Sequence, residues 1–103
     1  MAYKLKITEK AEADLDEILN YLLMELSNPT AAKNLLNEVQ KRYDLLEQTP
    51  RIYSECEQAL LKKSHYRKIV INGFLLIFRV DEMENVVYIE RYFSDLEDYA
   101  NKL

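Results

Sequence analysis

The dipeptide Asn72-Gly73 constrains the fold of this chain most, because it separates two runs of β-branched and aromatic residues. Asn-Gly between apolar runs is a strong hairpin signal, since a type I′ turn needs positive φ at both central residues. Gly73 is also the only glycine in the chain. The sequence therefore predicts a hairpin over residues 65–80. A third run of the same character at 86–92 predicts a three-stranded antiparallel meander.

A two-residue loop fixes the register of this hairpin, with Ile71 opposite Phe74. Across the second turn we expect Val80 to pair with Val86. Alternation then gives an apolar face that is expected to be core: Ile69, Ile71, Phe74, Leu76, Phe78, Val80, Val86 and Tyr88. The opposite face is expected to be partly solvated and cationic: Tyr66, Lys68, Val70, Leu75, Ile77, Arg79, Val87, Ile89 and Arg91.

The first half of the chain predicts a short strand and two helices. Alternation over Tyr3–Ile7 indicates a strand near a sheet edge, and Thr8 is a suitable N-cap for a helix over residues 9–26. Asn28 and Pro29 begin a second helix that runs to about Gln48. Helical spacing places these residues on the apolar faces: Ala11, Leu15, Ile18, Leu19, Leu22 and Leu26, then Ala32, Leu35, Leu36, Val39, Tyr43 and Leu46.

These elements predict an α+β fold in the order β-α-α-β-β-β. An antiparallel helix hairpin packs on a small antiparallel meander sheet, and a short helix or tail follows. The chain is expected to form one domain over residues 1–103. It contains no apolar run of about 20 residues that could span a bilayer and no signal peptide. We therefore expect a cytoplasmic protein without a membrane partner.

Charge and cysteine content exclude several kinds of function. The net charge of −4 disfavours a protein that acts mainly by gripping phosphates. Cys56 is the only cysteine and His65 the only histidine, so neither an internal disulfide nor a structural zinc site is expected. We expect no metal and no cofactor.

One group of residues on the cationic face suggests a binding function: Tyr66, Lys68, Arg79 and Arg91. Such cations could hold a phosphate backbone or an acidic peptide while a base stacks on the tyrosine ring. Alternatively, their aliphatic stems pack on neighbouring aliphatic side chains, and the charged groups reach water or pair with acids. The residues alone leave both interpretations open.

Several short strings, in this order, resemble the RelE/ParE toxins of bacterial type II toxin–antitoxin systems, also known as plasmid stabilisation proteins. They are Ala13-Asp14-Leu15-Asp16-Glu17-Ile18 with Tyr21, Asn28-Pro29-Thr30-Ala31-Ala32, Tyr66-Arg67-Lys68-Ile69, Phe74-Leu75-Leu76-Ile77-Phe78-Arg79-Val80-Asp81-Glu82, Val87-Tyr88-Ile89-Glu90-Arg91 and Asp98-Tyr99. The resemblance covers nearly the whole chain. It implies a growth-inhibiting toxin that a cognate antitoxin holds inactive, as a homodimer or as a hetero-oligomer with the antitoxin. The antitoxin is expected on the helix hairpin around Leu15, Leu22, Leu36 and Tyr43.

Members of this family differ in their target. RelE-like members cut messenger RNA on the ribosome with basic residues and often a C-terminal tyrosine, whereas ParE-like members poison DNA gyrase. Candidates for a catalytic role here are Lys68, Arg79, Arg91 and Tyr99.

This chain departs from the ribonuclease pattern at two places. Leu75 stands where ribonuclease members tend to carry an arginine. Ser94-Asp95-Leu96-Glu97 replaces a basic string before Asp98-Tyr99. Two acids and a leucine cannot stabilise a phosphorane. The resemblance therefore favours a ParE-like inhibitor of gyrase. The alternatives are a RelE-like mRNA endoribonuclease and a degenerate member that only binds its antitoxin.

Overall fold

A computed structural model describes residues 2–53 and 65–94 of this chain. A strand is followed by two helices and three further strands, so the predicted α+β fold and its element order are confirmed. The elements are β1 (Lys4–Ile7), α1 (Glu9–Asn20), a π-helical turn η1 (Tyr21–Glu25), α2 (Pro29–Gln48), a 3-10 turn η2 (Pro50–Ile52), β2 (Tyr66–Ile71), β3 (Phe74–Asp81) and β4 (Val86–Ser94).

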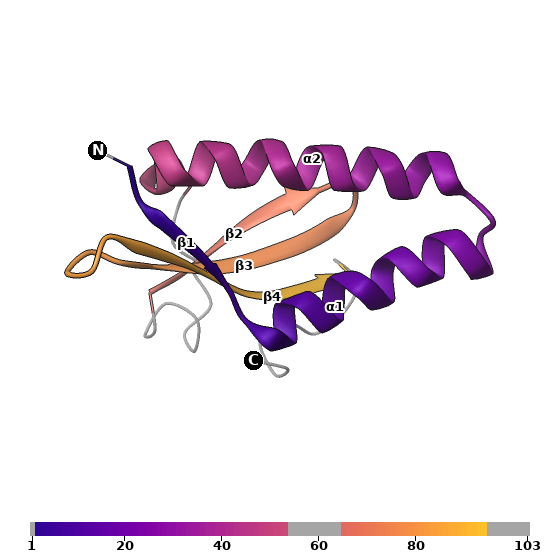
Figure 1. Ribbon diagram of the computed structural model, residues 1–103, viewed down its shortest axis with the longest axis horizontal. Coiled ribbons are helices and arrows are strands. Elements are labelled where there is room, and N and C mark those ends of the chain that lie inside the picture. The colour runs from indigo at the N-terminus through magenta and orange to yellow at the C-terminus, as the bar shows by residue number, and fades with distance from the viewer. Residues whose placement is uncertain (1, 54–64, 95–103) are drawn as a thin grey trace.

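The four strands form one open sheet in the order β1-β4-β3-β2 (Figure 1). Strands β2, β3 and β4 are the predicted antiparallel meander. Strand β1 adds to the outer edge of β4 in parallel, with Lys4 opposite Val86 and Ile7 opposite Ile89. The first and last strands of the described chain are therefore neighbours, which makes the sheet mixed.

Side-chain caps begin both helices where the sequence predicts them. The Thr8 hydroxyl accepts a hydrogen bond from the Ala11 amide at 3.1 Å, and the Asn28 side chain accepts one from the Ala31 amide at 3.0 Å. Between the helices, the Leu26 amide donates to the Tyr21 carbonyl at 3.1 Å, which widens the last turn of the first helix. No helix in the described part of the chain is long and apolar enough to cross a membrane.

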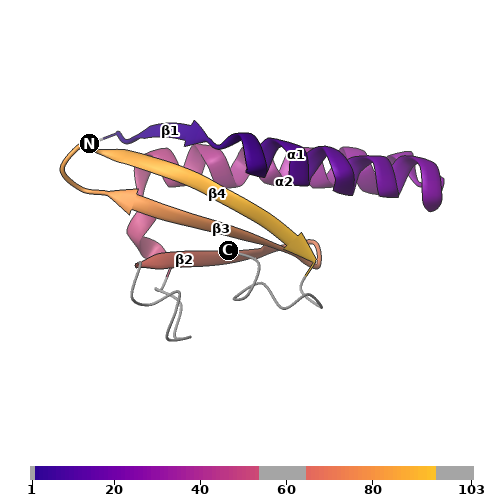
Figure 2. The ribbon, with the colours of Figure 1, turned by 90° about the horizontal axis from the view of Figure 1, so that it is seen from below.

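The helices bury one face of the sheet, and their far end extends beyond the strands (Figures 1 and 2). This core contains buried residues of both helices and three strands: Ala11, Leu22, Ala32, Leu35, Val39, Tyr43, Leu46, Ile69, Ile71, Leu76, Phe78, Val87, Ile89 and Tyr92. Two residues predicted for the apolar helix faces are instead exposed, Leu26 by 52% and Leu36 by 46%. Leu26 directly follows the π-helical turn, which breaks the 3.6-residue spacing on which its prediction depended.

The first hairpin has the predicted register. Asn72 and Gly73 have φ values of 50° and 84°, and Ile71 pairs with Phe74. The second register was predicted wrongly by one residue, because Asp81 rather than Val80 pairs with Val86. The Asp81 carboxylate accepts hydrogen bonds from the amides of Met83 and Glu84, both at 3.1 Å, and so closes a shorter turn.

This one-residue difference inverts the start of β4. Val87 and Ile89 lie on the helix face and are fully buried. Val86 and Tyr88, which were predicted for that face, lie on the opposite one. A bulge then restores the predicted alternation, since Phe78 pairs with Ile89 while Ile77 pairs with Arg91.

Candidate functional site

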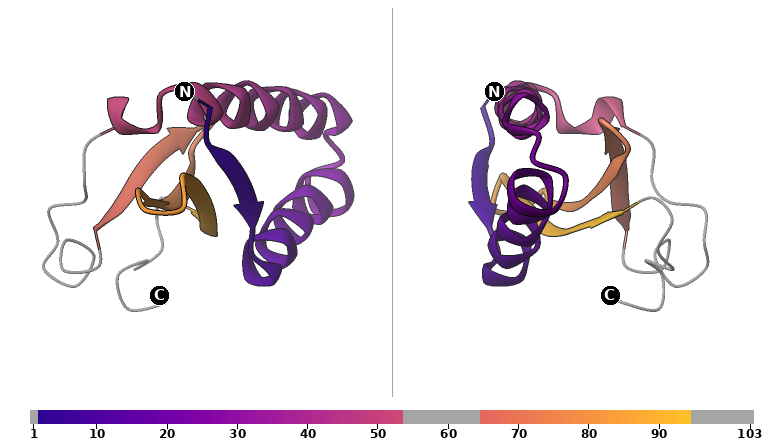
Figure 3. Two further views of the ribbon diagram at one scale, coloured as in Figure 1. Left: turned by 60° about the vertical axis from the view of Figure 1, so that its left-hand side comes forward. Right: turned by 90° about the vertical axis from the view of Figure 1, so that its right-hand side faces the viewer.

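The four residues Tyr66, Lys68, Arg79 and Arg91 lie on one face of the sheet, as the sequence predicts; we call this the cationic face. Tyr66 is directly opposite Arg79. Lys68 and Arg91 both pair with Ile77, one from each side. The cationic face is the side of the sheet that points away from the helices. The two views in Figure 3 show α1 and α2 on the other side of the sheet. A binding role for these four residues stays a prediction.

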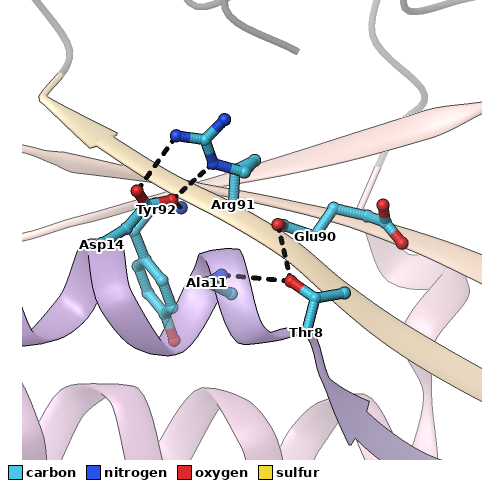
Figure 4. A network of polar contacts seen from close by, with 6 residues as sticks. All are labelled: Thr8, Ala11, Asp14, Glu90, Arg91 and Tyr92. Atoms are coloured by element: carbon cyan, nitrogen blue, oxygen red, sulfur yellow. Dashed lines mark hydrogen bonds and ion pairs between the residues drawn. The ribbon is translucent and has the colours of Figure 1, made fainter.

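Arg91 is held by an acid from the first helix. Its Nε lies 2.6 Å from Oδ2 of Asp14 and its Nη2 lies 3.0 Å from Oδ1 (Figure 4). Only 20% of the Arg91 side chain and 13% of the Asp14 side chain are exposed. The guanidinium also lies 4.7 Å above the Phe93 ring. The positive charge of Arg91 is therefore neutralised within the fold.

The same region joins α1 to the outer edge of β4. Strand β1 stops pairing at Ile89, and the Thr8 hydroxyl then donates to the Glu90 carbonyl at 2.9 Å. Further along, the Tyr92 amide donates to Oδ2 of Asp14 at 3.0 Å (Figure 4). Thr8 and Asp14 thus form hydrogen bonds with the backbone groups of β4 that lie beyond the end of β1.

Arg79 is also paired within the fold. Its guanidinium lies 4.5 Å above the Tyr88 ring, and its Nη2 is 3.8 Å from Oε1 of Glu90. Burial raises the pKa of the neighbouring Tyr66 phenol above its usual value, with a smaller contribution of the same sign from the charge of Glu90. The bulge brings Glu90 to Arg79, so both arginines of the cationic face have a carboxylate partner.

The middle of this face is less solvated than the sequence predicts. Leu75, Ile77 and Phe93 are at most 3% exposed and form a second small cluster with Tyr66. Val70, by contrast, is 57% exposed at the edge of the sheet. The expectation of a partly solvated surface therefore holds at the sheet edge and fails in its centre.

The structure buries most of the residues predicted to bind an antitoxin. Leu15 packs against the core, Leu22 is 7% exposed and Tyr43 is 9% exposed, whereas Leu36 reaches the surface. The Tyr43 hydroxyl is hydrogen-bonded to the hydroxyl of Tyr92, and burial raises the pKa of both phenols. Tyr99, the departure at residues 95–97 and Cys56 lie outside the described residues.

A basic hollow at the end of the sheet was not predicted. His65, Arg67 and Arg79 belong to the predicted hairpin, in which Arg67 pairs with Phe78 next to Arg79. Arg51 comes from η2, and no spacing rule places it beside them. Within residues 2–53 and 65–94, no group of three His, Cys, Asp or Glu side chains could hold a metal ion.

Comparison with known proteins gives a consistent picture. The sequence model described as "ParE toxin of type II toxin-antitoxin system, parDE" matches residues 5–99. A toxin–antitoxin structure, the chromosomal ParDE system of P. aeruginosa, aligns with a TM-score of 0.68 at 24% identity, covering 90% of this chain and 96% of that one. A mutant E. coli toxin RelE in the free state aligns with a TM-score of 0.67 at 16% identity, covering 99% and 93%.

The toxin–antitoxin complex RelBE2 of Mycobacterium tuberculosis aligns with a TM-score of 0.64 at 18% identity, covering 91% of this chain and 99% of that one. At these identities, the three solved structures establish the fold. No curated protein matches the chain significantly.

Proposed function

We propose that this chain, which belongs to the ParE toxin family of type II toxin–antitoxin systems, inhibits growth by acting on DNA gyrase. The family membership follows from the match over residues 5–99 and agrees with the shared fold. The choice of gyrase over messenger RNA depends on one observation: the arginines of the cationic face are already paired with acids.

An RNA-cleaving site must stabilise negative charge that develops on the phosphoryl oxygens, and it does so with cations aimed at the reacting phosphate. Here Arg91 donates two hydrogen bonds to Asp14, and Arg79 contacts both the Tyr88 ring and the Glu90 carboxylate. Leu75, where ribonuclease relatives tend to carry an arginine, is 3% exposed. These contacts support a toxin that does not cleave RNA.

The proposal is tested with purified toxin and DNA gyrase in supercoiling and cleavage-complex assays. We expect inhibition of supercoiling or trapped cleavage complexes at micromolar toxin. Addition of the antitoxin should abolish either effect. If gyrase is neither inhibited nor trapped at that concentration, the proposal is wrong.

The ribonuclease alternative is tested by primer extension on RNA from cells that express the toxin. Ribosome-dependent cuts that disappear in Lys68→Ala or Arg79→Ala would replace the gyrase proposal. Lys41→Ala is a suitable control, because Lys41 is exposed, lies on α2 and pairs only with Glu38 at 3.3 Å in the described structure. A chain that binds its antitoxin but leaves growth unchanged would instead be a degenerate member.

We further propose that the cognate antitoxin docks on the apolar end of the helix hairpin. Large apolar side chains are exposed on both of its helices: Tyr21, Leu23, Met24 and Leu26 at the end of the first, and Leu36 on α2. A free chain that leaves such a patch open is a candidate for coupled folding and binding by a partner segment. Solved toxin–antitoxin complexes with this fold support a partner of this kind.

Calorimetry with the cognate antitoxin tests this docking surface. We expect Leu36→Ser to weaken binding by roughly tenfold, since Leu36 is 46% exposed and burial of that part contributes about half of the 1.5–3 kcal/mol of a whole leucine. Leu45→Ser is the matched control, because Leu45 is 37% exposed on the same helix and lies outside the patch. Equal effects of the two variants, or no binding by the wild type, would contradict the assignment.

A further inference from the structure

The far end of the helix hairpin is almost free of charged side chains. Residues 18–37, which we call the hairpin tip, carry only Glu25 and Lys33, although the whole chain has 14 basic and 18 acidic residues. The tip consists of the end of α1, η1 and the first half of α2, and its end extends beyond the strands (Figures 1 and 2). The cores of protein–protein interfaces are likewise depleted of charge and enriched in aromatic residues and methionine.

The large exposed side chains of the hairpin tip are apolar. They lie on η1, directly after it and on α2: Tyr21, Leu23, Met24, Leu26 and Leu36. Met24 is 76% exposed, and Leu22 is the only buried residue of the stretch 21–26. A helical turn that is apolar on all sides is typical of a segment that another surface covers.

Hydrogen bonds fix the backbone of the hairpin tip. The Leu26 amide donates to the Tyr21 carbonyl at 3.1 Å, and the Asn28 amide donates to the Leu22 carbonyl at 2.8 Å. Ser27 between them has a φ of 46°, the left-handed conformation in which many helices end. An ordered backbone therefore presents the exposed side chains, which reduces the entropic cost of burying them against a partner.

The two charged residues of the hairpin tip have opposite signs. Glu25 is the last residue of η1, Lys33 lies in the second turn of α2, and both are exposed. Within residues 2–53 and 65–94, neither side chain has a hydrogen bond or an ion pair. The tip thus has no net charge, whereas residues 9–17 of α1 carry five acids and one base. Two copies of this acidic chain therefore repel each other least at their tips.

We propose that two copies of this chain, when free of antitoxin, pair through their hairpin tips. In a two-fold symmetric pair both copies use the same surface, so Glu25 of each copy can meet Lys33 of the other. The apolar side chains of η1 are covered in the same contact. A patch of roughly 300–600 Å², the usual largest size on a monomer, is smaller than the roughly 800 Å² that each partner buries in a standard interface. We therefore expect a reversible dimer.

Sedimentation equilibrium of the purified toxin without antitoxin measures this self-association. We expect a monomer–dimer equilibrium between low and high micromolar concentrations. Met24→Glu places a charge in the contact and should weaken the dimer by about tenfold or more. Met83→Glu is the matched control, because Met83 is 94% exposed in the turn between β3 and β4, outside the tip. A wild type that stays monomeric, or equal effects of the two variants, would refute the proposal.

Exchange of the two charges tests the symmetry of the contact. Glu25→Lys and Lys33→Glu each replace attraction by repulsion at two places, so each should weaken the dimer roughly tenfold. The double variant has opposite charges again and should dimerise like the wild type. A mixture of the two single variants should also dimerise, because a copy that is positive at both positions then meets a copy that is negative at both. If either combination fails to restore the dimer, the tips do not pair in this way.

The cognate antitoxin should dissociate the dimer, and this expectation alone rests on the antitoxin docking proposed above. A dimer that persists in the complex would contradict the shared surface. The sedimentation experiment uses neither gyrase nor DNA. Its failure would therefore leave the proposed action on gyrase untouched, and failure of the supercoiling assay would leave the dimer untouched.

Discussion

Removal of the Asp14 carboxylate should lower the free energy of unfolding substantially. Its carboxylate accepts two hydrogen bonds from Arg91 and one from the Tyr92 amide, and it joins α1 to β4 (Figure 4). Asp14→Ala would remove this carboxylate partner from Arg91, whose side chain is only 20% exposed. It would also leave the Tyr92 amide without its acceptor at the edge of the sheet.

The expected loss follows from these contacts. Hydrogen bonds to charged groups contribute about 1.5–3 kcal/mol each, and removal of one partner from a buried pair costs about 3–5 kcal/mol. Arg91 keeps some access to water and its contact with the Phe93 ring, which reduces the penalty. We therefore expect Asp14→Ala to lower the free energy of unfolding by about 2–4 kcal/mol. Asp14→Asn should cost less, because its amide oxygen can still accept from Tyr92.

Urea denaturation followed by far-ultraviolet circular dichroism measures this loss. The control is Asp16→Ala, an exposed acid on the same helix, which should change the free energy of unfolding by at most about 0.5 kcal/mol. In a double-mutant cycle, Asp14→Ala and Arg91→Ala should couple by more than about 1 kcal/mol. If Asp14→Ala and Asp16→Ala have the same effect, the contact does not stabilise the fold and the reasoning fails.

Three further predictions concern the turn, the buried phenols and the core. Gly73→Ala should cost about 1–2 kcal/mol from its φ of 84° alone, because nothing lies within 4 Å of an added Cβ; a much larger loss in urea denaturation would show an unseen clash. Tyr43→Phe should cost about 1–3 kcal/mol, since it leaves the buried Tyr92 hydroxyl without its partner. Burial raises the pKa of both phenols in the folded chain, so the unfolded chain loses these protons first as pH rises. Stability should therefore be unaffected by them below about pH 10 and should fall above it, less steeply in Tyr43→Phe. Phe78→Ala should cost about 3–5 kcal/mol, measured by thermal unfolding, because Phe78 is fully buried between helices and sheet.

The sequence predicted the parts of the fold that local chemistry determines. Asn72 and Gly73 determined the first turn and therefore the pairing of β2 with β3, and Thr8 and Asn28 marked the helix starts. The second turn was harder, because the side chain of Asp81 closes it and a polar stretch shows no preferred length. The β-branched residues Val87 and Ile89, two positions apart, are the sequence feature that favours the observed register of β4.

The predicted face of Arg91 is correct only because two differences from the predicted register, the shorter turn and the bulge, cancel. The shifted turn moves it to the helix side, and the bulge at Glu90 moves it back. A bulge leaves no clear mark in a sequence, so its second effect, the contact of Glu90 with Arg79, could not be predicted either. The same holds for the position of Arg51 beside the hairpin arginines Arg67 and Arg79, since no local pattern links η2 to the sheet.

The pairing of β1 with β4 also determines when the protein can finish folding during synthesis. Lys4 pairs with Val86, and the Thr8 amide donates to the Ile89 carbonyl. β1 can therefore join the sheet only after β4 has left the ribosome. Such non-local contacts form slowly, because a long loop must close before they contribute. The sheet of the nascent chain therefore stays incomplete at least until β4 has been translated.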